Sequence, residues 1–579
     1  MREVRVWAPM STGVMVDLPD RRIPMTPGPH GWWSAMLPAG ATEYAFVLDD
    51  GRPLPDPRSP YQPDGVHGRS RMVDHSAFEW TDRGWRQAPL DSAVFYELHI
   101  GTFTEAGTFD AALARIPHLR ELGVTHVELM PVAEFSGDWG WGYDGVGLYA
   151  PHHAYGGPDG LKRLVNALHA AGLAAILDVV YNHLGPAGNY LGRFGPYFTN
   201  CVHTPWGEAV NFNGRSSDEV RRFFLDNALM WLRDYHFDGL RLDAVHAISD
   251  SSALHFLEEL ATAVADLETR VNRPLCIIAE SDLNDPRLIR PRTHGGYGLA
   301  GQWSDDFHHA LHSVLTGERT GYYSDFGSLE RLARALERGY VYDGQYSGFR
   351  DRRHGRPLEP HLKNRLLGYM QNHDQIGNRA QGERISALTS LNRVRIGAAL
   401  VVLGPFIPLL FQGEEWGAAT PFQYFTNHPD PDLGRAVSRG RREEFAAFGW
   451  APEDVPDPQD PETFRRSKLN WAELEREPHH ELLAWYCSLI RFRKEHPGLA
   501  SADATVDFDE QDGWLILDRP GISVVCNFGE SPLRVPAIVR ESAVLGTPDG
   551  SRGDVLGPES VLVLEKTRVL RGARSSTSK

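Results

Sequence analysis

The sequence predicts an α/β protein built on a (β/α)8 TIM barrel, with an N-terminal β-sandwich domain and a C-terminal antiparallel β domain. From about residue 91, apolar β-rich segments alternate with segments of helical periodicity, about eight times in roughly 400 residues. Both ends of the chain instead show short apolar runs separated by Gly, Pro and Asp, which is typical of antiparallel sheets. At 579 residues the chain is also too long for a single core.

The first part of the chain, residues 1–90, is predicted to form an immunoglobulin-like β domain. The runs VRVWAP, GVMVDL, GWWSAML and YAFVLDD alternate with turn residues at the spacing of a small antiparallel fold. The segment 49–70 is rich in Pro and Gly, so we expect a long loop or linker there. We expect this domain to buttress the barrel; binding of the barrel's ligand is the alternative.

Residues 91–496 are predicted to form the barrel, with insertions. Strands are expected in the segments 94–103, 124–131, 173–183, 237–246, 275–281, 365–374 and the second half of 396–411. Helical periodicity lies between them, at 109–123, 161–172, 218–235, 253–268 and 328–339. A doubly wound sheet is the competing fold, but it would carry a Gly-rich phosphate turn, and the chain has no G-x-G-x-x-G or Walker pattern.

After the barrel, residues 497–570 are predicted to form a C-terminal β domain. The runs TVDFD, GWLILDR, ISVVCNF and SVLVLEK have the length and apolar character of strands. The last residues, 571–579, read RGARSSTSK and are expected to be a disordered tail.

Charge and cysteine usage exclude several classes of protein. The net charge is −17 and no basic run is present, which argues against a nucleic-acid partner. The start of the chain lacks an apolar signal-peptide region, and 396–411 is too short and too broken by Gly and Pro to span a membrane. The four cysteines are scattered without metal-ligand spacing. We therefore expect a cytoplasmic monomer or weak oligomer with no membrane partner.

Polar side chains gather where the predicted strands end, which is where barrel enzymes carry their catalytic residues. They come from four strands: Asp178 and His183; Arg241, Asp243 and His246; Glu280; His373 and Asp374. Any one of them alone is explained by loop capping or a structural ion pair, since Arg241 and Asp243 lie two residues apart and face the same way. Ion pairing gives no reason for acids at several separate strand ends, so their joint occurrence favours an active site.

Glycoside hydrolysis is the chemistry that these groups suit. A retaining glycosidase needs a carboxylate nucleophile and a carboxylic acid on the other side of the bond, about 5–5.5 Å apart. Asp243 beside the permanently charged Arg241 is expected to stay ionised, as a nucleophile must. Glu280 follows the apolar run CIIA, and this environment suits acid–base work. Asp374 can bind sugar hydroxyls and stabilise a positively charged transition state.

The segments DVVYNH (178–183), FDGLRLDAVH (237–246), IAES (278–281) and MQNHD (370–374) resemble the four signature regions of the α-amylase superfamily, glycoside hydrolase family 13. The resemblance implies that Asp243 is the nucleophile, Glu280 the proton donor and Asp374 the transition-state stabiliser. It also implies that Arg241, His183 and His373 contact the sugar in subsite −1. Tyr143, in GWGYDGVGLYAP, resembles the tyrosine that stacks under that sugar; packing within a loop is its structural alternative.

Longer motifs resemble the branch of this superfamily that releases trehalose. They include ELHIGTFTEAGTF (97–109), QWSDDFHHALH (302–312), HDQIGNR (373–379) and GEEWGAATPFQYFTNH (413–428). The implied reaction cleaves the α-1,4 bond next to the terminal trehalose of a maltooligosyl trehalose, releasing trehalose and a maltooligosaccharide in trehalose biosynthesis. Candidates for the trehalose side are Asp305, Asp306, His308, His309, Gln375 and Asn378, with Glu415, Trp416 and Phe425 as further candidates for that wall. A solvated loop is the alternative for 304–309.

No cofactor or metal is expected. Many α-amylases place the asparagine of the first signature region in a calcium site; Asn182 matches it, but the second half of such a site is not evident. The expected partner is a maltooligosyl trehalose or another α-1,4-glucan. Two alternatives share the predicted fold: a glycogen branching enzyme, which is a transferase, and a non-catalytic glucan-binding barrel. Relatives of the second kind lose one or more of the three acids, and all three stand in this chain.

Overall fold

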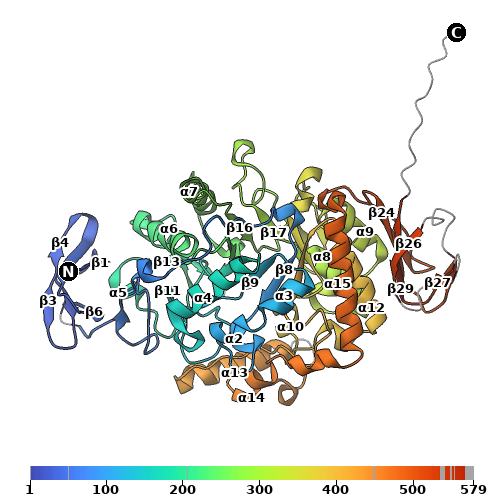
Figure 1. Ribbon diagram of the computed structural model, residues 1–579. Coiled ribbons are helices and arrows are strands. Elements are labelled where there is room, and N and C mark those ends of the chain that lie inside the picture. Colours follow the sequence, from blue (N-terminus) through green and yellow to red (C-terminus); the bar gives the residue numbers. More distant parts are fainter. Residues whose placement is uncertain are drawn as a thin grey trace, which may run out of the picture.

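The computed structural model describes residues 2–49, 51–204, 207–446, 450–534, 542–547, 551–552 and 555–566. N-terminal sheets, a central barrel and C-terminal sheets follow one another across the molecule (Figure 1). This arrangement confirms the fold class predicted from the sequence. The domain boundaries at residues 90 and 496 stay predictions, and the tail 571–579 lies outside the described residues.

The barrel is closed by eight parallel strands. In chain order they are β8 (Phe95–Leu98), β9 (His126–Leu129), β12 (Ala174–Val179), β15 (Gly239–Leu242), β16 (Cys276–Ala279), β17 (Gly301–Trp303), β20 (Leu366–Tyr369) and β21 (Ile407–Phe411). The last strand pairs with the first, so the sheet has no free edge. All of these strand residues are buried, which explains their nearly continuous apolar runs.

Helices cover the outside of the barrel (Figure 1). The main ones are α3 (Ile116–Leu122), α4 (Gly157–Ala170), α6 (Ser217–Asp234), α7 (Phe256–Val271), α8 (Asp305–Thr316), α9 (Leu329–Arg338), α12 (Leu391–Leu403) and α15 (His479–Glu495). Most bury one apolar face against the strands. Helix α12 is buried on nearly every side because α15 and the C-terminal sheet pack over it. The buried helix and strand expected in 396–411 are therefore both present.

Two predicted elements differ in the structure. The expected strand 94–103 ends at Leu98 and gives way to the short helix α1 (Ile100–Phe103). Strand β17 is present in the structure but is not among the seven strands predicted from the sequence, because three residues are too few to show a hydrophobic period. The segment that follows it is the start of helix α8 and is mostly buried, so the solvated-loop alternative for 304–309 is wrong.

The N-terminal part contains two antiparallel sheets. One consists of β1 (Arg2–Trp7), β5 (Trp32–Leu37) and β4 (Thr26–Pro27); the other of β3 (Arg22–Pro24), β2 (Val14–Asp17), β6 (Glu43–Leu48) and β7 (Ser70–Arg71). The segment 49–70 joins this part to the barrel: Arg58 Nη1 donates hydrogen bonds to Asp226 on α6 at 2.7 Å and to Tyr149 at 3.0 Å. These contacts favour a buttressing role.

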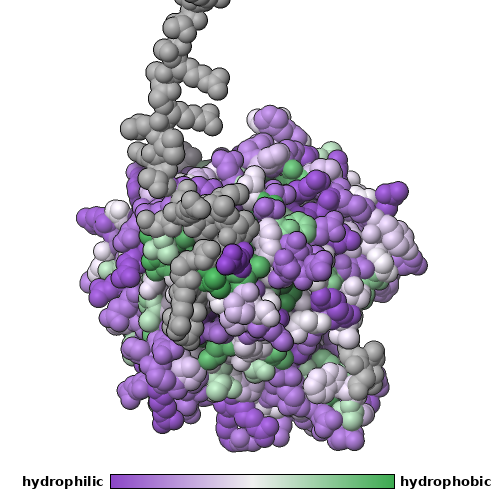
Figure 2. Space-filling view, turned by 90° about the vertical axis from the view of Figure 1, so that its right-hand side faces the viewer, coloured by the Kyte–Doolittle hydropathy of each residue, from purple (hydrophilic) through white to green (hydrophobic). Residues whose placement is uncertain are grey.

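The C-terminal part holds a five-stranded antiparallel sheet of β22 (Thr505–Asp509), β23 (Trp514–Arg519), β24 (Ile522–Asn527), β29 (Ser560–Glu565) and β26 (Ser542–Gly546). A smaller sheet consists of β25 (Leu533–Arg534), β28 (Val555–Leu556) and β27 (Ser551–Arg552). The large sheet packs on α12, where Arg393 forms an ion pair with Glu559 at 2.7 Å. Among the coloured residues, this end of the molecule is largely hydrophilic, with hydrophobic residues in small separate patches (Figure 2).

The remaining elements lie in the connections. They are β10 (Ala133–Glu134) with β11 (Gly147–Pro151), β13 (Phe198–Thr204) with β14 (Gly207–Val210), β18 (Tyr346–Ser347) with β19 (Arg352–Arg353), and the helices α2 (Phe109–Leu113), α5 (Leu191–Phe194), α10 (His373–Gly377), α11 (Ile385–Leu388), α13 (Pro431–Ala446) and α14 (Pro461–Arg466). Helices α13 and α14 lie along the lower edge of the view in Figure 1. None of the described helices combines the length and the apolar character that a membrane crossing requires.

Candidate active site

The polar residues predicted at the strand ends meet at one rim of the barrel. Asp178 and Arg241 lie opposite each other on the paired strands β12 and β15. Asp243 and Glu280 come directly after β15 and β16. The side chain of Asn372 accepts a hydrogen bond from the Gln375 N–H and caps helix α10, which places His373 and Asp374 in its first turn. Parallel strands end on the same side, so residues far apart in the sequence are brought together.

Arg241 is the centre of this group. Its Nη1 atom lies 2.7 Å from Asp178 Oδ2 and 3.1 Å from Asp243 Oδ1, and its Nη2 atom lies 3.0 Å from Glu280 Oε2. The guanidinium is fully buried and lies over the Trp303 ring, 4.3 Å from the ring centroid. A buried cation of this kind is tolerated only when it is paired. One arginine therefore holds three carboxyl groups in fixed positions.

Asp243 is held from a second side by Asn182. The Asn182 amide nitrogen donates to the Asp243 carbonyl oxygen at 2.7 Å and to its Oδ2 atom at 2.8 Å. The amide oxygen of Asn182 contacts the ring of His183, whose burial lowers its pKa to about 4. Asn182 is thus engaged in orienting Asp243, and the carboxylate is fixed through both oxygens.

Glu280 is anchored through one oxygen. Its Oε2 atom accepts a hydrogen bond from the Ala244 N–H at 2.6 Å. Ala244 has a φ of 38°, a left-handed conformation that is strained for a residue with a Cβ atom. Burial raises the pKa of the Glu280 carboxyl and Arg241 opposes this. An anchored carboxyl with a raised pKa can hold a proton and deliver it to a bound substrate.

Asp374, His373 and Tyr143 complete the rim. The Nε2 atom of His373 lies 3.5 Å from Asp374 Oδ1, and burial raises the pKa of Asp374. The Tyr143 ring stacks on the His373 ring with centroids 5.0 Å apart, and its hydroxyl donates to Asp178 Oδ2 at 2.6 Å. Burial raises the pKa of Asp178 to about 7, against the effect of Arg241. Tyr143 is therefore tied to the site rather than packed in a remote loop.

A cleft of about 580 Å³, open to solvent, extends from this rim. Five of the predicted binding or catalytic residues line it: Asp305, His309, Asp374, Gln375 and Asn378. Aromatic side chains that can stack on sugar faces line the same space, namely Tyr322, Tyr323, Phe349, Phe445 and Trp450. His246 is exposed and lies near Asp282, another residue of the cleft wall. A cleft that is rich in both polar and aromatic groups fits an oligosaccharide.

Two predicted binding residues are corrected by the structure. The carboxyl of Asp306 is buried and accepts from the Asn284 side chain and from the backbone N–H groups of residues 341 and 342. His308 is fully buried, with Nδ1 at 2.8 Å from the Met370 carbonyl and Nε2 at 2.9 Å from the Tyr323 hydroxyl. Both side chains are buried and bonded to protein groups, three of them on Oδ2 of Asp306, and these contacts stabilise the fold.

The further candidates after β21 are also core residues. Glu415 accepts from the Tyr96 hydroxyl at 3.0 Å and contacts His118 at 2.8 Å, with no exposed surface. Trp416 and Phe425 are likewise fully buried. These three residues do not line the cleft described above. Their apolar or paired surroundings explain them as supports of the barrel.

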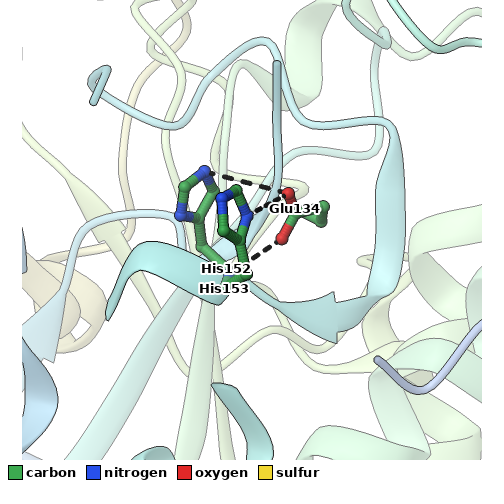
Figure 3. Close-up of side chains that lie close together, drawn as sticks. All are labelled: Glu134, His152 and His153. Atoms are coloured by element: carbon green, nitrogen blue, oxygen red, sulfur yellow. Dashed lines mark hydrogen bonds and ion pairs between the residues drawn. The ribbon is translucent and has the colours of Figure 1, made fainter. Parts of the chain in front are cut away.

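One group among the described residues has the composition of a metal site, formed by Glu134, His152 and His153 (Figure 3). The Nδ1 atom of His153 lies 2.7 Å from Glu134 Oε1, a hydrogen-bond distance that leaves no room for an ion between them. The two imidazole rings stack at an interplanar angle of 26°, so their in-plane lone pairs do not converge on one point. As it stands, this group is an ion pair with a stacked histidine.

Two residues of the site were not predicted as functional. Glu97, on β8, contacts His373, and Trp303, on β17, lies beneath Arg241. Glu97 could have been predicted from the sequence, because it is an acid within the apolar run FYEL, and a buried charge requires a partner. Trp303 lies in the motif 302–312, but the three-residue strand that places it under Arg241 has no period by which the sequence could predict it.

Comparison with known proteins is consistent with this geometry. Residues 81–194 match the family model "Alpha amylase, catalytic domain", and residues 499–563 match a "Domain of unknown function (DUF3459)". A malto-oligosyltrehalose trehalohydrolase of Arthrobacter ramosus is 52% identical, over 92% of this chain and 94% of that protein. One of Mycobacterium tuberculosis is 50% identical, over 94% and 97%.

Among solved structures, one described as a putative alpha amylase from Salmonella typhimurium superimposes with a TM-score of 0.90 at 40% identity, covering 97% of both chains. The overall fold thus agrees with that solved structure, and the sequence matches the relatives over nearly the whole chain. The chain belongs to the malto-oligosyltrehalose trehalohydrolase family, within the α-amylase superfamily.

Proposed function

We propose that this chain is a retaining glycoside hydrolase that cleaves the α-1,4 bond next to the terminal trehalose of a maltooligosyl trehalose. The products are trehalose and a maltooligosaccharide shortened by the trehalose unit. The observation that carries the reaction type is the buried Arg241, which lies within 3.1 Å of both Asp243 and Glu280. The choice of substrate is supported by the family to which the chain belongs.

In the proposed first step, the carboxylate of Asp243 attacks the anomeric carbon of the glucose that precedes trehalose. Glu280 gives its proton to the glycosidic oxygen, that bond breaks, and trehalose leaves. In the second step Glu280 takes a proton from water, and the water oxygen displaces Asp243 from the sugar. The maltooligosaccharide is released with its original anomeric configuration. Fixing Asp243 through both oxygens, as Asn182 and Arg241 do, suits the attack on carbon.

We assign the remaining rim residues to the sugar that is attacked. Asp374 balances positive charge on the ring in the transition state. Tyr143 offers its ring as a stacking platform, and Asp178, His183, Arg241 and His373 form the walls. The cleft residues Asp305, His309, Gln375 and Asn378, with His246 beyond them, are proposed to contact the substrate. None of these steps calls for a metal or a cofactor.

The test is a comparison of two substrates. Incubation with maltooligosyl trehalose is expected to release free trehalose, while incubation with amylose is expected to give no new α-1,6 branch points. Branches in amylose, detected by debranching and chain-length analysis, would instead identify the chain as a glycogen branching enzyme. Absence of turnover on both substrates, with binding retained, would identify a non-catalytic glucan-binding barrel.

We further propose that the chain acts in trehalose biosynthesis in the cytoplasm, as a monomer or weak oligomer. All four cysteines are free, which suits a reducing compartment. The proposed division into domains at residues 90 and 496 is supported by the sheets on either side of the barrel.

A further inference from the structure

Glu97 is a fully buried acid at the centre of the barrel rim. Its Oε2 atom accepts a hydrogen bond from the backbone N–H of His373 at 3.1 Å, and its Oε1 atom contacts the ring Nδ1 of the same residue. The opposite ring nitrogen, Nε2, lies 3.5 Å from Asp374 Oδ1. Both carboxyl oxygens of Glu97 thus contact the same histidine, and this fixes the direction in which the imidazole points.

A second buried acid, Glu128, lies beside Glu97 in register on the neighbouring strand β9. Its two carboxyl oxygens have no hydrogen-bond partner within the described residues. Burial and the nearby Glu97 raise the pKa of Glu128 well above its ordinary range. Glu128 therefore keeps its proton, and Glu97 is the acid of this pair that contacts a cationic partner.

The charged groups around His373 come from several elements. Glu97 on β8 and Asp374 on α10 favour its protonated form. Glu128 on β9 and Glu280 after β16 also face His373, but burial raises the pKa of both carboxyls, and they favour the imidazolium only when they are ionised. Arg241 on β15 acts against it. His99, directly after β8, also faces His373, but burial lowers the pKa of His99 to about 3, so its ring is neutral where His373 titrates. Burial also acts against the charge, but the Glu97 and Asp374 carboxyls outweigh it and raise the pKa of His373 to about 9.

We infer that Glu97 is a positioning residue, which holds His373 as an imidazolium with Nδ1 engaged and Nε2 directed at Asp374 and the bound sugar. It acts through His373 and touches no reacting atom. For the reaction proposed above, a fixed N–H donor at this point binds sugar hydroxyls and keeps Asp374 oriented throughout turnover. The expected effect of Glu97 on the reaction rate rests on the proposed function. Its expected effect on the pH at which His373 titrates does not.

The first experiment follows the titration of His373 in the full-length protein labelled with ¹⁵N-histidine, with the signal assigned by its loss in His373→Gln. In the wild type His373 is expected to titrate near pH 9. In Glu97→Gln the titration is expected at or below the ordinary histidine value of about 6.5. A wild-type His373 that titrates below pH 7 would overturn the inference, even if no variant could be folded.

The second experiment compares two isosteric substitutions in adjacent strands, Glu97→Gln and Glu128→Gln. In Glu97→Gln, kcat at pH 7 is expected to fall about tenfold or more, with the alkaline limb of its pH profile moved to lower pH. Glu128→Gln replaces a neutral acid by a neutral amide and is expected to stay within about twofold of the wild type. Equal losses in both variants, with unchanged pH profiles, would show a structural role only.

A double-mutant comparison tests whether Glu97 acts through His373. In a His373→Gln background, Glu97→Gln is expected to cost less than about twofold, since the group on which it acts is gone. A full, independent loss in that background contradicts the inference. If the wild type releases no trehalose at all, the proposed function fails, whereas the histidine titration still decides the role of Glu97.

Discussion

The Nη1 atom of Arg241 lies 2.7 Å from Oδ2 of Asp178, and both side chains are almost completely buried. The same guanidinium also reaches Asp243 and Glu280, so a single residue relates the two carboxyl groups on which the proposed mechanism depends. Arg241 is therefore expected to contribute both to the stability of the fold and to the proposed reaction. Several consequences can be measured.

Substituting Arg241 by Lys is expected to impair both stability and activity. A lysine ammonium keeps the charge but cannot bridge three carboxyl groups with the planar fork of a guanidinium. We expect a free energy of unfolding lower by about 1–3 kcal/mol. We also expect a kcat lower on the order of 10²-fold, because Asp243 and Glu280 lose the guanidinium that positions both of them. Denaturant unfolding and initial rates measure the two effects.

The control is Arg287→Lys, at an exposed arginine that pairs with Asp285 at 2.6 Å on the surface. It is expected to change stability by no more than about 0.5 kcal/mol and to leave the rate unchanged. If both lysine variants behaved alike, Arg241 would have no special role in holding the acids.

Asp243→Asn tests the nucleophile. The amide has the shape of the carboxylate and keeps the contact with Asn182 through its oxygen, so the thermal midpoint is expected to change little. Without the negative charge, no covalent intermediate forms, and trehalose release is expected to fall on the order of 10³-fold or more. Activity within tenfold of the wild type would show that another group attacks the sugar.

The neighbouring acids Asp305 and Asp306 give a matched pair. Asp305 lines the cleft and contacts Tyr369, whereas Asp306 accepts three hydrogen bonds inside the protein. We expect Asp305→Asn to raise KM about fivefold or more with little change in stability, corresponding to about 1 kcal/mol of binding. Asp306→Asn is expected to lower the free energy of unfolding by about 1–3 kcal/mol with KM unchanged. The reverse pattern would exchange their assigned roles.

Glu318 lies in the wall of the cleft and is expected to stabilise the protein in a pH-dependent way. It lies 2.6 Å from His312 Nε2 and 2.8 Å from Arg379 Nη2, and these partners lower the pKa of its carboxyl from 4.5 to about 2. Because the folded-state pKa is the lower one, its contribution to stability is full above about pH 4.5 and is lost as the pH falls toward 2. Glu318→Gln should therefore destabilise the protein at pH 6 by about 1–3 kcal/mol and have little effect near pH 2.

Unfolding in urea at a series of pH values measures this difference. Glu475→Gln, at an exposed position, serves as the control and is expected to show a difference near zero at every pH. A constant gap between Glu318→Gln and the wild type from pH 6 to pH 2 would show that packing, not charge, explains the loss.

The barrel and its three acids could be predicted from the sequence because both depend on local patterns. Buried parallel strands require continuous apolar runs, and acids such as Glu280 stand out at the end of such a run. Seven of the eight strands carry that signal. β17 does not, because it has three residues and its burial comes from its neighbours.

The binding residues after β17 show where local patterns fail. Asp305, Asp306, His308 and His309 are indistinguishable in composition, but they begin a helix, so positions four apart share one face. Asp305 and His309 therefore line the cleft, while Asp306 and His308 face protein groups. Without knowing that α8 starts at Asp305, no sequence argument could separate the two pairs.

By itself, then, the sequence determined the order of strands and helices and the chemistry at their ends, since hydrophobic period and residue type are properties of short segments. Tertiary structure alone decided which of those groups touch. Closure of the barrel places Arg241 against three carboxyl groups from separate strand ends, and strand register sets Glu97 beside Glu128 while leaving only one of them on His373. Such contacts join residues up to 276 positions apart, and they exist only once the eight strands have paired.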